Sequence, residues 1–148
     1  MVSSRGQSKG CLATFVERKT RFYVAIKMDD RTKDSMFLAI SSLYNTLTSK
    51  LLKTFTVDRG KKFACFEQVE TEFGIPMYFA DAYAAWQRGS NENSNGLLRE
   101  FFPKKTDLAK VTLDKLTEAL MLINNRPRKC LGFKTPFDMF KHEIRKLI

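Results

Sequence analysis

The chain has 148 residues, enough for one domain with a hydrophobic core. Its 43% hydrophobic and 12% aromatic content is typical of a globular protein and excludes a largely disordered one. The 26 Lys and Arg residues against 16 Asp and Glu give a formal charge of +10, which attracts polyanions. Nucleic acid is the commonest such partner, and a ribosome-associated or merely basic protein is the alternative.

The cysteines, at positions 11, 65 and 130, are widely spaced and odd in number, so they predict no disulfide framework. With the single His142 they do not form a zinc-binding spacing either, and we expect buried thiols and a surface histidine. No apolar run approaches the roughly 20 residues of a membrane span. The first ten residues lack the apolar region of a secretory signal, so we expect a reducing cytosol.

The predicted elements alternate between strands and helices. Residues 1–10 carry one aliphatic side chain, Val2, and are predicted to form a polar, solvated tail. Two β-rich runs, 11–17 and 22–28, predict a hairpin. The remaining expected elements are helix 34–49, strand 53–57, helix 65–73 ending at Gly74, strand 77–79, a helix from about Glu92 to Pro103, a helix capped by Thr112, and a helix beginning at Thr135-Pro136. This order predicts an α/β domain over residues 11–148 with extra C-terminal helices.

Two carboxylates are the candidate metal ligands. Asp58 follows a short strand and Glu92 begins a helix, with 33 residues between them. Carboxylates at a strand end and a helix N-terminus can converge on Mg²⁺, which prefers hard oxygen ligands. Each has a structural alternative: Asp58 precedes Gly60 and suits an Asx turn, and Glu92 would stabilise the helix dipole.

Several basic and aromatic residues are candidates for DNA contact. Arg99 lies two helical turns after Glu92 on the same face, although a solvated helix arginine is the alternative. Trp86 and Arg88 share a loop and suit stacking on bases beside a phosphate contact, although the tryptophan could instead fix the loop to the core. Phosphate contact is also predicted for a third group, which could alternatively stabilise a helix C-terminus: Arg126, Arg128 and Lys129.

Seven short stretches in order resemble the integrase-type catalytic core of transposases of the insertion-sequence-thirty family. They cover about residues 11–140: TFVERKTRF (14–22), FTVDRGKKF (55–63), YFAD (78–81), WQRGSNENSNGLLR (86–99), FFP (101–103), NNRPRKCLG (124–132) and KTP (134–136). The resemblance implies a ribonuclease-H-like fold and an Asp-Asp-Glu site that holds two Mg²⁺ or Mn²⁺ ions. By motif, Asp58 would be the second carboxylate and Glu92 the third, and Arg99 would lie near transposon-end DNA.

The chain departs from this pattern at several places, among them the first aspartate and the residues that follow Asp58. The first aspartate of the family lies on a strand before the hairpin, whereas residues 1–10 contain no acid. We therefore expect an incomplete fold without its first central strand, in two sheet halves and unstable alone. Arg59 replaces the usual Asn and Lys62 a common Glu, and cations beside a dication site weaken metal binding.

The resemblance implies double-stranded DNA as the partner, with self-association or a full-length transposase as further partners, no membrane, and a nucleoid-associated bacterial location. The preferred interpretation is a catalytic-core fragment for DNA strand cleavage and transfer that is inactive alone. The alternatives are a non-catalytic DNA-binding or oligomerising fragment that modulates a full-length transposase, and one half of a split enzyme.

Overall fold

The computed structural model describes residues 2–4, 8–57, 65–79 and 89–146. It divides into two compact units where the sequence predicted one domain: a first unit of Met1–Lys27 with Ser90–Ile148, and a second unit of Met28–Gly89. The strands form two sheets, ordered β1-β2-β3 and β4-β5, as expected for two sheet halves. None of the described helices is long and apolar enough to cross a membrane.

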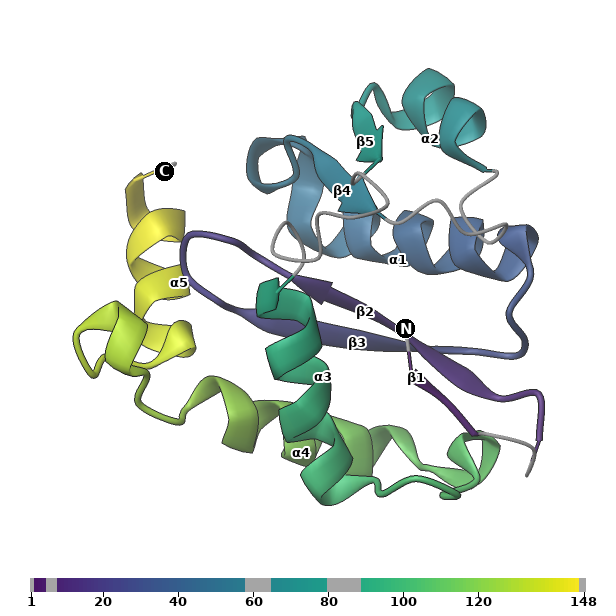
Figure 1. Cartoon of the computed structure of the whole chain (residues 1–148). Helices are drawn as coiled ribbons and strands as arrows, with labels where there is room; N and C mark the ends of the chain where they lie inside the picture. The colour runs from purple at the N-terminus through teal and green to yellow at the C-terminus, as the bar shows by residue number, and fades with distance from the viewer. Residues whose placement is uncertain (1, 5–7, 58–64, 80–88, 147–148) are drawn as a thin grey trace. The chain divides into compact units, whose positions relative to one another are not determined.

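The three-stranded sheet is built on the predicted hairpin (Figure 1). Strands β2 (Cys11–Val16) and β3 (Tyr23–Met28) are joined by a turn in which the Glu17 N–H donates to the Phe22 carbonyl at 2.8 Å. The Glu17 carboxylate accepts hydrogen bonds from the N–H and the hydroxyl of Thr20, both at 2.6 Å. The side chain of Glu17 therefore fixes the turn that its backbone begins.

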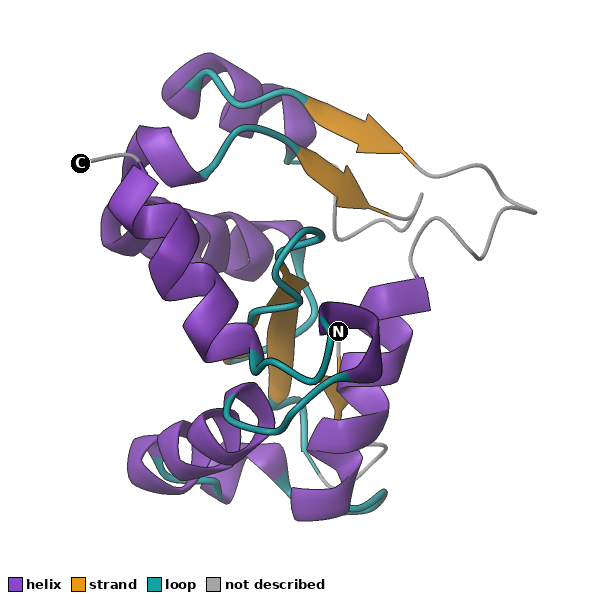
Figure 2. Cartoon of the chain, turned by 90° about the vertical axis from the view of Figure 1, so that its left-hand side faces the viewer, coloured by secondary structure: helices purple, strands orange, loops and turns teal. Residues whose placement is uncertain are grey.

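Three α-helices complete the first unit: α3 (Gly89–Phe101), α4 (Leu113–Asn124) and α5 (Pro136–Lys146). Short 3-10 turns, η3 (Leu108–Lys110) and η4 (Lys129–Leu131), precede α4 and α5 (Figure 2). The caps are as predicted, because Thr112 accepts from the Lys115 N–H at 3.2 Å and Thr135 from the Asp138 N–H at 3.1 Å. One core joins α3, η3 and α4 to the sheet. It is made of Val2, Leu12, Tyr23, Ala25, Leu98, Phe102, Leu108, Val111, Leu116, Ala119 and Ile123.

The N-terminal residues correct the expectation of a solvated tail. Strand β1 (Val2–Ser3) pairs antiparallel with β2, with Val2 opposite Leu12. Ser4 is fully buried, and its hydroxyl donates to the Gly10 carbonyl at 2.8 Å and accepts from the Leu108 N–H at 2.9 Å. Strand pairing and serine hydrogen bonds satisfy the polar backbone, which allows a segment with few apolar side chains to be buried.

The second unit contains α1 (Lys33–Leu51), β4 (Phe55–Val57), α2 (Phe66–Phe73) and β5 (Met77–Phe79). Strands β4 and β5 pair in parallel, with Phe55 opposite Met77. Helix α2 ends as predicted at Gly74, whose left-handed φ of 65° suits glycine. The Phe73 ring packs on Tyr44 of α1 with centroids 4.6 Å apart, and this contact joins the two helices of the unit.

Candidate functional site

Glu92 lies in the first turn of α3, and its side chain is exposed. The helix behind it is fixed to the sheet, because Leu98 is fully buried and Asn95 accepts a 2.6 Å hydrogen bond from the Tyr23 hydroxyl. Asn95 follows Glu92 by three residues, so the two side chains share one face of the helix. The turn that carries the candidate carboxylate is therefore anchored to β3.

Tyr23 also connects α4 to the same strand. The Tyr23 N–H donates to Asn124 Oδ1 and Asn124 Nδ2 donates to the Tyr23 carbonyl, both at 2.9 Å. Both residues are buried, and burial raises the pKa of the Tyr23 hydroxyl well above its usual value. The Asn124 amide pairs with the strand backbone as a neighbouring strand would. Tyr23 therefore links β3 to both α3 and α4.

Arg99, predicted to contact DNA, has a structural role in this fold. Its guanidinium donates to the carbonyls of Ser3 at 2.7 Å, Phe102 at 3.2 Å and Pro103 at 3.4 Å, and its side chain is half-buried. These hydrogen bonds fasten β1 to the end of α3. A DNA contact by Arg99 stays a prediction, and it would have to compete with these carbonyls for the same N–H groups.

The cations after α4 have different surroundings. Arg126 forms an ion pair with Glu100 at 3.3 Å, and Lys129 is exposed. Arg128 is half-buried, and its Nε and Nη2 atoms are buried without a hydrogen-bond partner in the described part of the chain. Desolvation by burial lowers the pKa of Arg128, and the neighbouring charges of Arg126 and Arg21 lower it further. A partly buried cation beside two like charges favours a bound anion.

Comparison with known proteins agrees with the resemblance in the motifs. The chain is 38% identical over 139 residues to transposase InsI of insertion sequence element IS30A from Escherichia coli, which covers 94% of the chain and 36% of the relative. It is 33% identical over 132 residues to the transposase of element IS1086 from Cupriavidus metallidurans, covering 89% of the chain and 39% of that relative. By sequence the chain belongs to the insertion-sequence-thirty family of transposases. It spans little more than a third of the length of these relatives.

Solved structures confirm the ribonuclease-H-like integrase fold. The catalytic core domain of BIV integrase superposes with a TM-score of 0.69 at 18% identity, covering 94% of this chain and 97% of that one. The HTLV-2 integrase catalytic core domain, solved in complex with magnesium, gives a TM-score of 0.66 at 20% identity, with coverage of 90% and 86%. No family model matches the chain.

Part of the candidate transposase site lies outside the described residues, namely Asp58, Trp86 and Arg88, together with Arg59 and Lys62. The roles predicted for these residues stay predictions. Among the residues that the structure does describe, no group of three His, Cys, Asp or Glu side chains could hold a metal ion. Glu92 is thus the one predicted metal ligand whose position is described.

The sequence pattern missed the residues that hold this site in place. Asn95 and Asn124 both lie within family-like stretches, where they would be taken for surface residues of helices. A weak signal existed in Asn124, because it occupies a position on the apolar stripe that Leu116, Leu120 and Ile123 define on the predicted helix. A polar residue that joins such a stripe must find a partner, and here the partner is the Tyr23 backbone.

Proposed function

We propose that the chain is part of a transposase catalytic core that cleaves transposon ends and joins them to target DNA by metal-dependent phosphoryl transfer. The observation that carries this proposal is the alignment with insertion-sequence transposases over 94% of the chain, together with the integrase fold. The formal charge of +10 supports double-stranded DNA as the substrate. Strand cleavage and strand transfer both need an activated oxygen nucleophile placed in line with a phosphate.

Asp58 and Glu92 would hold the divalent cation, Mg²⁺ or Mn²⁺. Carboxylates are the hard oxygen ligands that these ions prefer, and Mg²⁺ takes few of them from protein. When bound, the ion polarises the phosphate and activates the attacking oxygen. Glu92 suits this role because its side chain is exposed, while the hydrogen bond between Tyr23 and Asn95 holds its helical turn in place.

Two carboxylates alone would bind the ion weakly. The family pattern places a further aspartate before the hairpin, but β1 is Val-Ser and residues 1–10 contain no acid. Arg59 and Lys62 add positive charge near Asp58 in the sequence, which opposes cation binding. We therefore expect these 148 residues to bind DNA without cleaving it, until a third carboxylate is supplied.

A cleavage and joining assay tests this proposal. The purified chain is incubated with a duplex carrying transposon-end sequence from a related element, in Mg²⁺ and separately in Mn²⁺. We expect bound DNA and no nicked or joined product. Product that Glu92→Gln abolishes and the matched control Glu100→Gln retains would show that the chain is active alone and would contradict the requirement for a third carboxylate. Glu100 is a suitable control because it is exposed on the same helix.

A second candidate function is a non-catalytic fragment that binds DNA or associates with a full-length transposase. It is supported by exposed apolar side chains on α4, namely Leu113, Met121 and Leu122, which are 69%, 60% and 52% exposed. Exposed apolar side chains gathered on one helix are typical of interaction surfaces. Sedimentation of the chain alone and mixed with a full-length relative tests the association, and free sedimentation of both proteins would exclude that association.

A further inference from the structure

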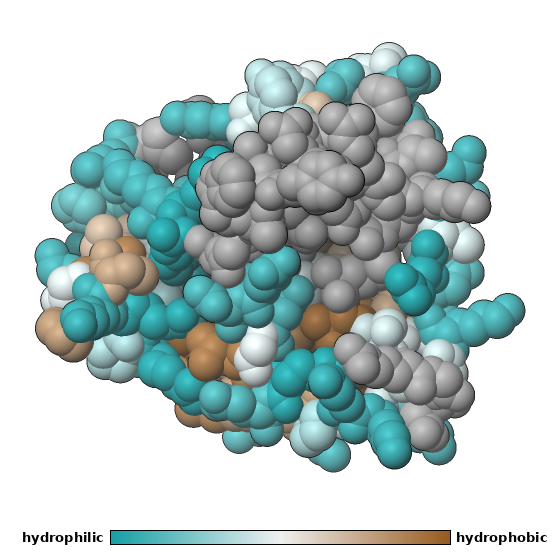
Figure 3. All heavy atoms as spheres, in the orientation of Figure 1, coloured by the Kyte–Doolittle hydropathy of each residue, from teal (hydrophilic) through white to brown (hydrophobic). Residues whose placement is uncertain are grey.

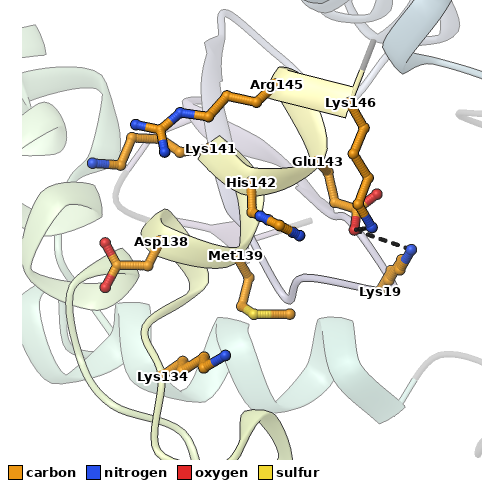
Figure 4. A pocket seen from close by; sticks show the side chains of 9 residues that line it. All are labelled: Lys19, Lys134, Asp138, Met139, Lys141, His142, Glu143, Arg145 and Lys146. Atoms are coloured by element: carbon orange, nitrogen blue, oxygen red, sulfur yellow. Dashed lines mark hydrogen bonds and ion pairs between the residues drawn. The ribbon is translucent and has the colours of Figure 1, made fainter.

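An open depression of about 610 Å³ lies beside α5, and we call it the α5 basin. It is formed by α5, by Lys134 before the helix and by Lys19 in the turn between β2 and β3 (Figure 4). Five of its nine lining residues are lysine or arginine and two are acidic. Glu92 is not among them, so the basin is separate from the predicted metal ligand.

The two walls of the basin are fixed to each other. The rings of Phe22 at the hairpin and Phe140 on α5 stack with centroids 4.2 Å apart and an interplanar angle of 7°. Phe140 is buried, so this contact adds apolar burial to ring stacking. Across the rim, Lys19 Nζ lies 3.0 Å from Glu143 Oε1. The cations on the hairpin and on α5 therefore belong to one preformed surface.

The positive charges of the basin outnumber the carboxylates that could neutralise them. Glu143 is shared by two lysines, with Lys146 Nζ 3.3 Å from the carboxylate oxygen that Lys19 also contacts. These contacts, that of Lys19 first, lower the pKa of Glu143, so the carboxylate stays ionised and holds both ammonium groups in place. One negative charge against two positive charges leaves a net positive charge on this rim.

The remaining cations of the basin have no acidic partner among the residues that the structure describes. Within the described part of the chain, Lys134 and Arg145 form no ion pair. Lys141 lies over the Phe137 ring, with Nζ 4.7 Å from its centroid, which leaves its charge unneutralised. All three cationic side chains are exposed, and hydrophilic side chains predominate around the upper part of α5 (Figure 3). Such a surface favours a partner with several negative charges.

We propose that the α5 basin binds the phosphodiester backbone of double-stranded DNA, as a contact separate from the carboxylates. The choice of DNA among polyanions rests on the proposed function. An open basin suits a backbone that passes across it, and duplex DNA presents one charge per about 1.7 Å of its axis. Lysine and arginine contacts to phosphates fix the position of DNA without reading its sequence, so this contact orients a duplex and does not select it.

The test measures binding of a labelled duplex by the full chain in EDTA over a range of salt concentrations. The basin variant combines Lys134→Gln, Lys141→Gln and Arg145→Gln. The control variant removes the same charge from exposed lysines elsewhere: Lys53→Gln, Lys104→Gln and Lys115→Gln. We expect the basin variant to bind about tenfold more weakly or worse, and its salt slope to fall by about two to three. The control variant should change the DNA affinity by less than about twofold, and its salt slope should match that of the wild-type chain.

Two outcomes would overturn the inference. Equal losses in the basin and control variants would mean that only net charge matters. Competition by polyglutamate as effective as competition by duplex DNA would mean that the basin binds polyanions in general and does not recognise a phosphodiester backbone. Unfolding is excluded by matched thermal melts, with Arg145→Gln alone as the milder variant. Because EDTA removes divalent cations, the assay measures DNA binding without the metal site, so a failure of the proposed metal site leaves this result unaffected.

Discussion

The Tyr23 hydroxyl donates a 2.6 Å hydrogen bond to Asn95 Oδ1, and this bond connects strand β3 to the helical turn that carries Glu92. The tyrosine is fully buried, and its backbone is paired with the Asn124 side chain. A candidate metal ligand on a solvent-exposed turn thus depends for its position on a buried residue that does no chemistry. Preorganisation of this kind is needed because small displacements of a ligand reduce catalysis strongly.

Tyr23→Phe should lower the free energy of unfolding by about 1 kcal/mol, because it removes one buried hydrogen bond and leaves Asn95 Oδ1 without its donor. Urea denaturation measures the loss. Tyr78→Phe is the control, since Tyr78 is 58% exposed and should change stability by less than about 0.5 kcal/mol. Equal effects of the two substitutions would contradict the role of Tyr23.

The raised pKa of Tyr23 gives stability a pH dependence. The folded state keeps the phenol protonated above the pH at which the unfolded chain releases the proton, about 10, so stability falls as pH rises from there. Above pH 10, the free energy of unfolding of the wild-type protein should therefore fall by about 1.4 kcal/mol more per pH unit than that of the Tyr23→Phe variant. Parallel curves of unfolding free energy against pH for the two proteins would disprove this.

Asn124→Ala should destabilise the protein by about 2–3 kcal/mol, because it leaves the buried N–H and carbonyl of Tyr23 unsatisfied. The neighbouring Asn125→Ala serves as the control. Asn125 is exposed, and its side-chain amide donates a hydrogen bond to the Met121 carbonyl at 2.8 Å, so a loss of about 0.5 kcal/mol or less is expected. Thermal and urea unfolding of both variants would reveal the difference.

Gly10→Ala and Gly96→Ala should change the stability of the protein in opposite directions. A Cβ at Gly10 would lie 2.7 Å from the Ala109 backbone N, so Gly10→Ala should cost about 1–3 kcal/mol. A Cβ at Gly96 meets nothing within 4 Å, and alanine should stabilise helix α3 by about 0.5–1 kcal/mol. Tolerance of Gly10→Ala would show that the N-terminal segment does not pack on η3.

Arg128→Leu should leave stability unchanged or raise it by up to about 2 kcal/mol, because it removes a partly buried cation that has two unpartnered nitrogen atoms. The same substitution should weaken DNA binding if Arg128 contacts a phosphate, as the sequence predicts. Lys129→Leu controls for the lost charge, since Lys129 is exposed beside it. A destabilised Arg128→Leu variant with unchanged DNA binding would assign the arginine to the fold instead.

Local signals predicted most elements of this fold. Gly74, Thr112 and Thr135 mark helix ends through backbone and capping rules that operate within a few residues, and all three act as expected. The N-terminal segment could not be predicted in this way. Ser4 is buried by a partner 104 residues away, Leu108, and no local pattern records such a contact.

In the candidate site too, local features could be predicted from the sequence and contacts between distant residues could not. Glu92 was predicted as a metal ligand from its position before an apolar-periodic run and from the family-like stretch around it, and this role stays a prediction. Its anchoring was not found, because the contact between Tyr23 and Asn95 spans 72 residues. The structural role of Arg99 was not found either, because its guanidinium donates to three backbone carbonyls, and its DNA contact stays a prediction.

Titration with Mn²⁺ followed by electron paramagnetic resonance tests whether Asp58 and Glu92 together bind a divalent cation. We expect weak binding that both Asp58→Asn and Glu92→Gln abolish, while Glu100→Gln leaves it intact. Mn²⁺ uptake unchanged in Asp58→Asn and Glu92→Gln would show that these carboxylates do not bind the ion.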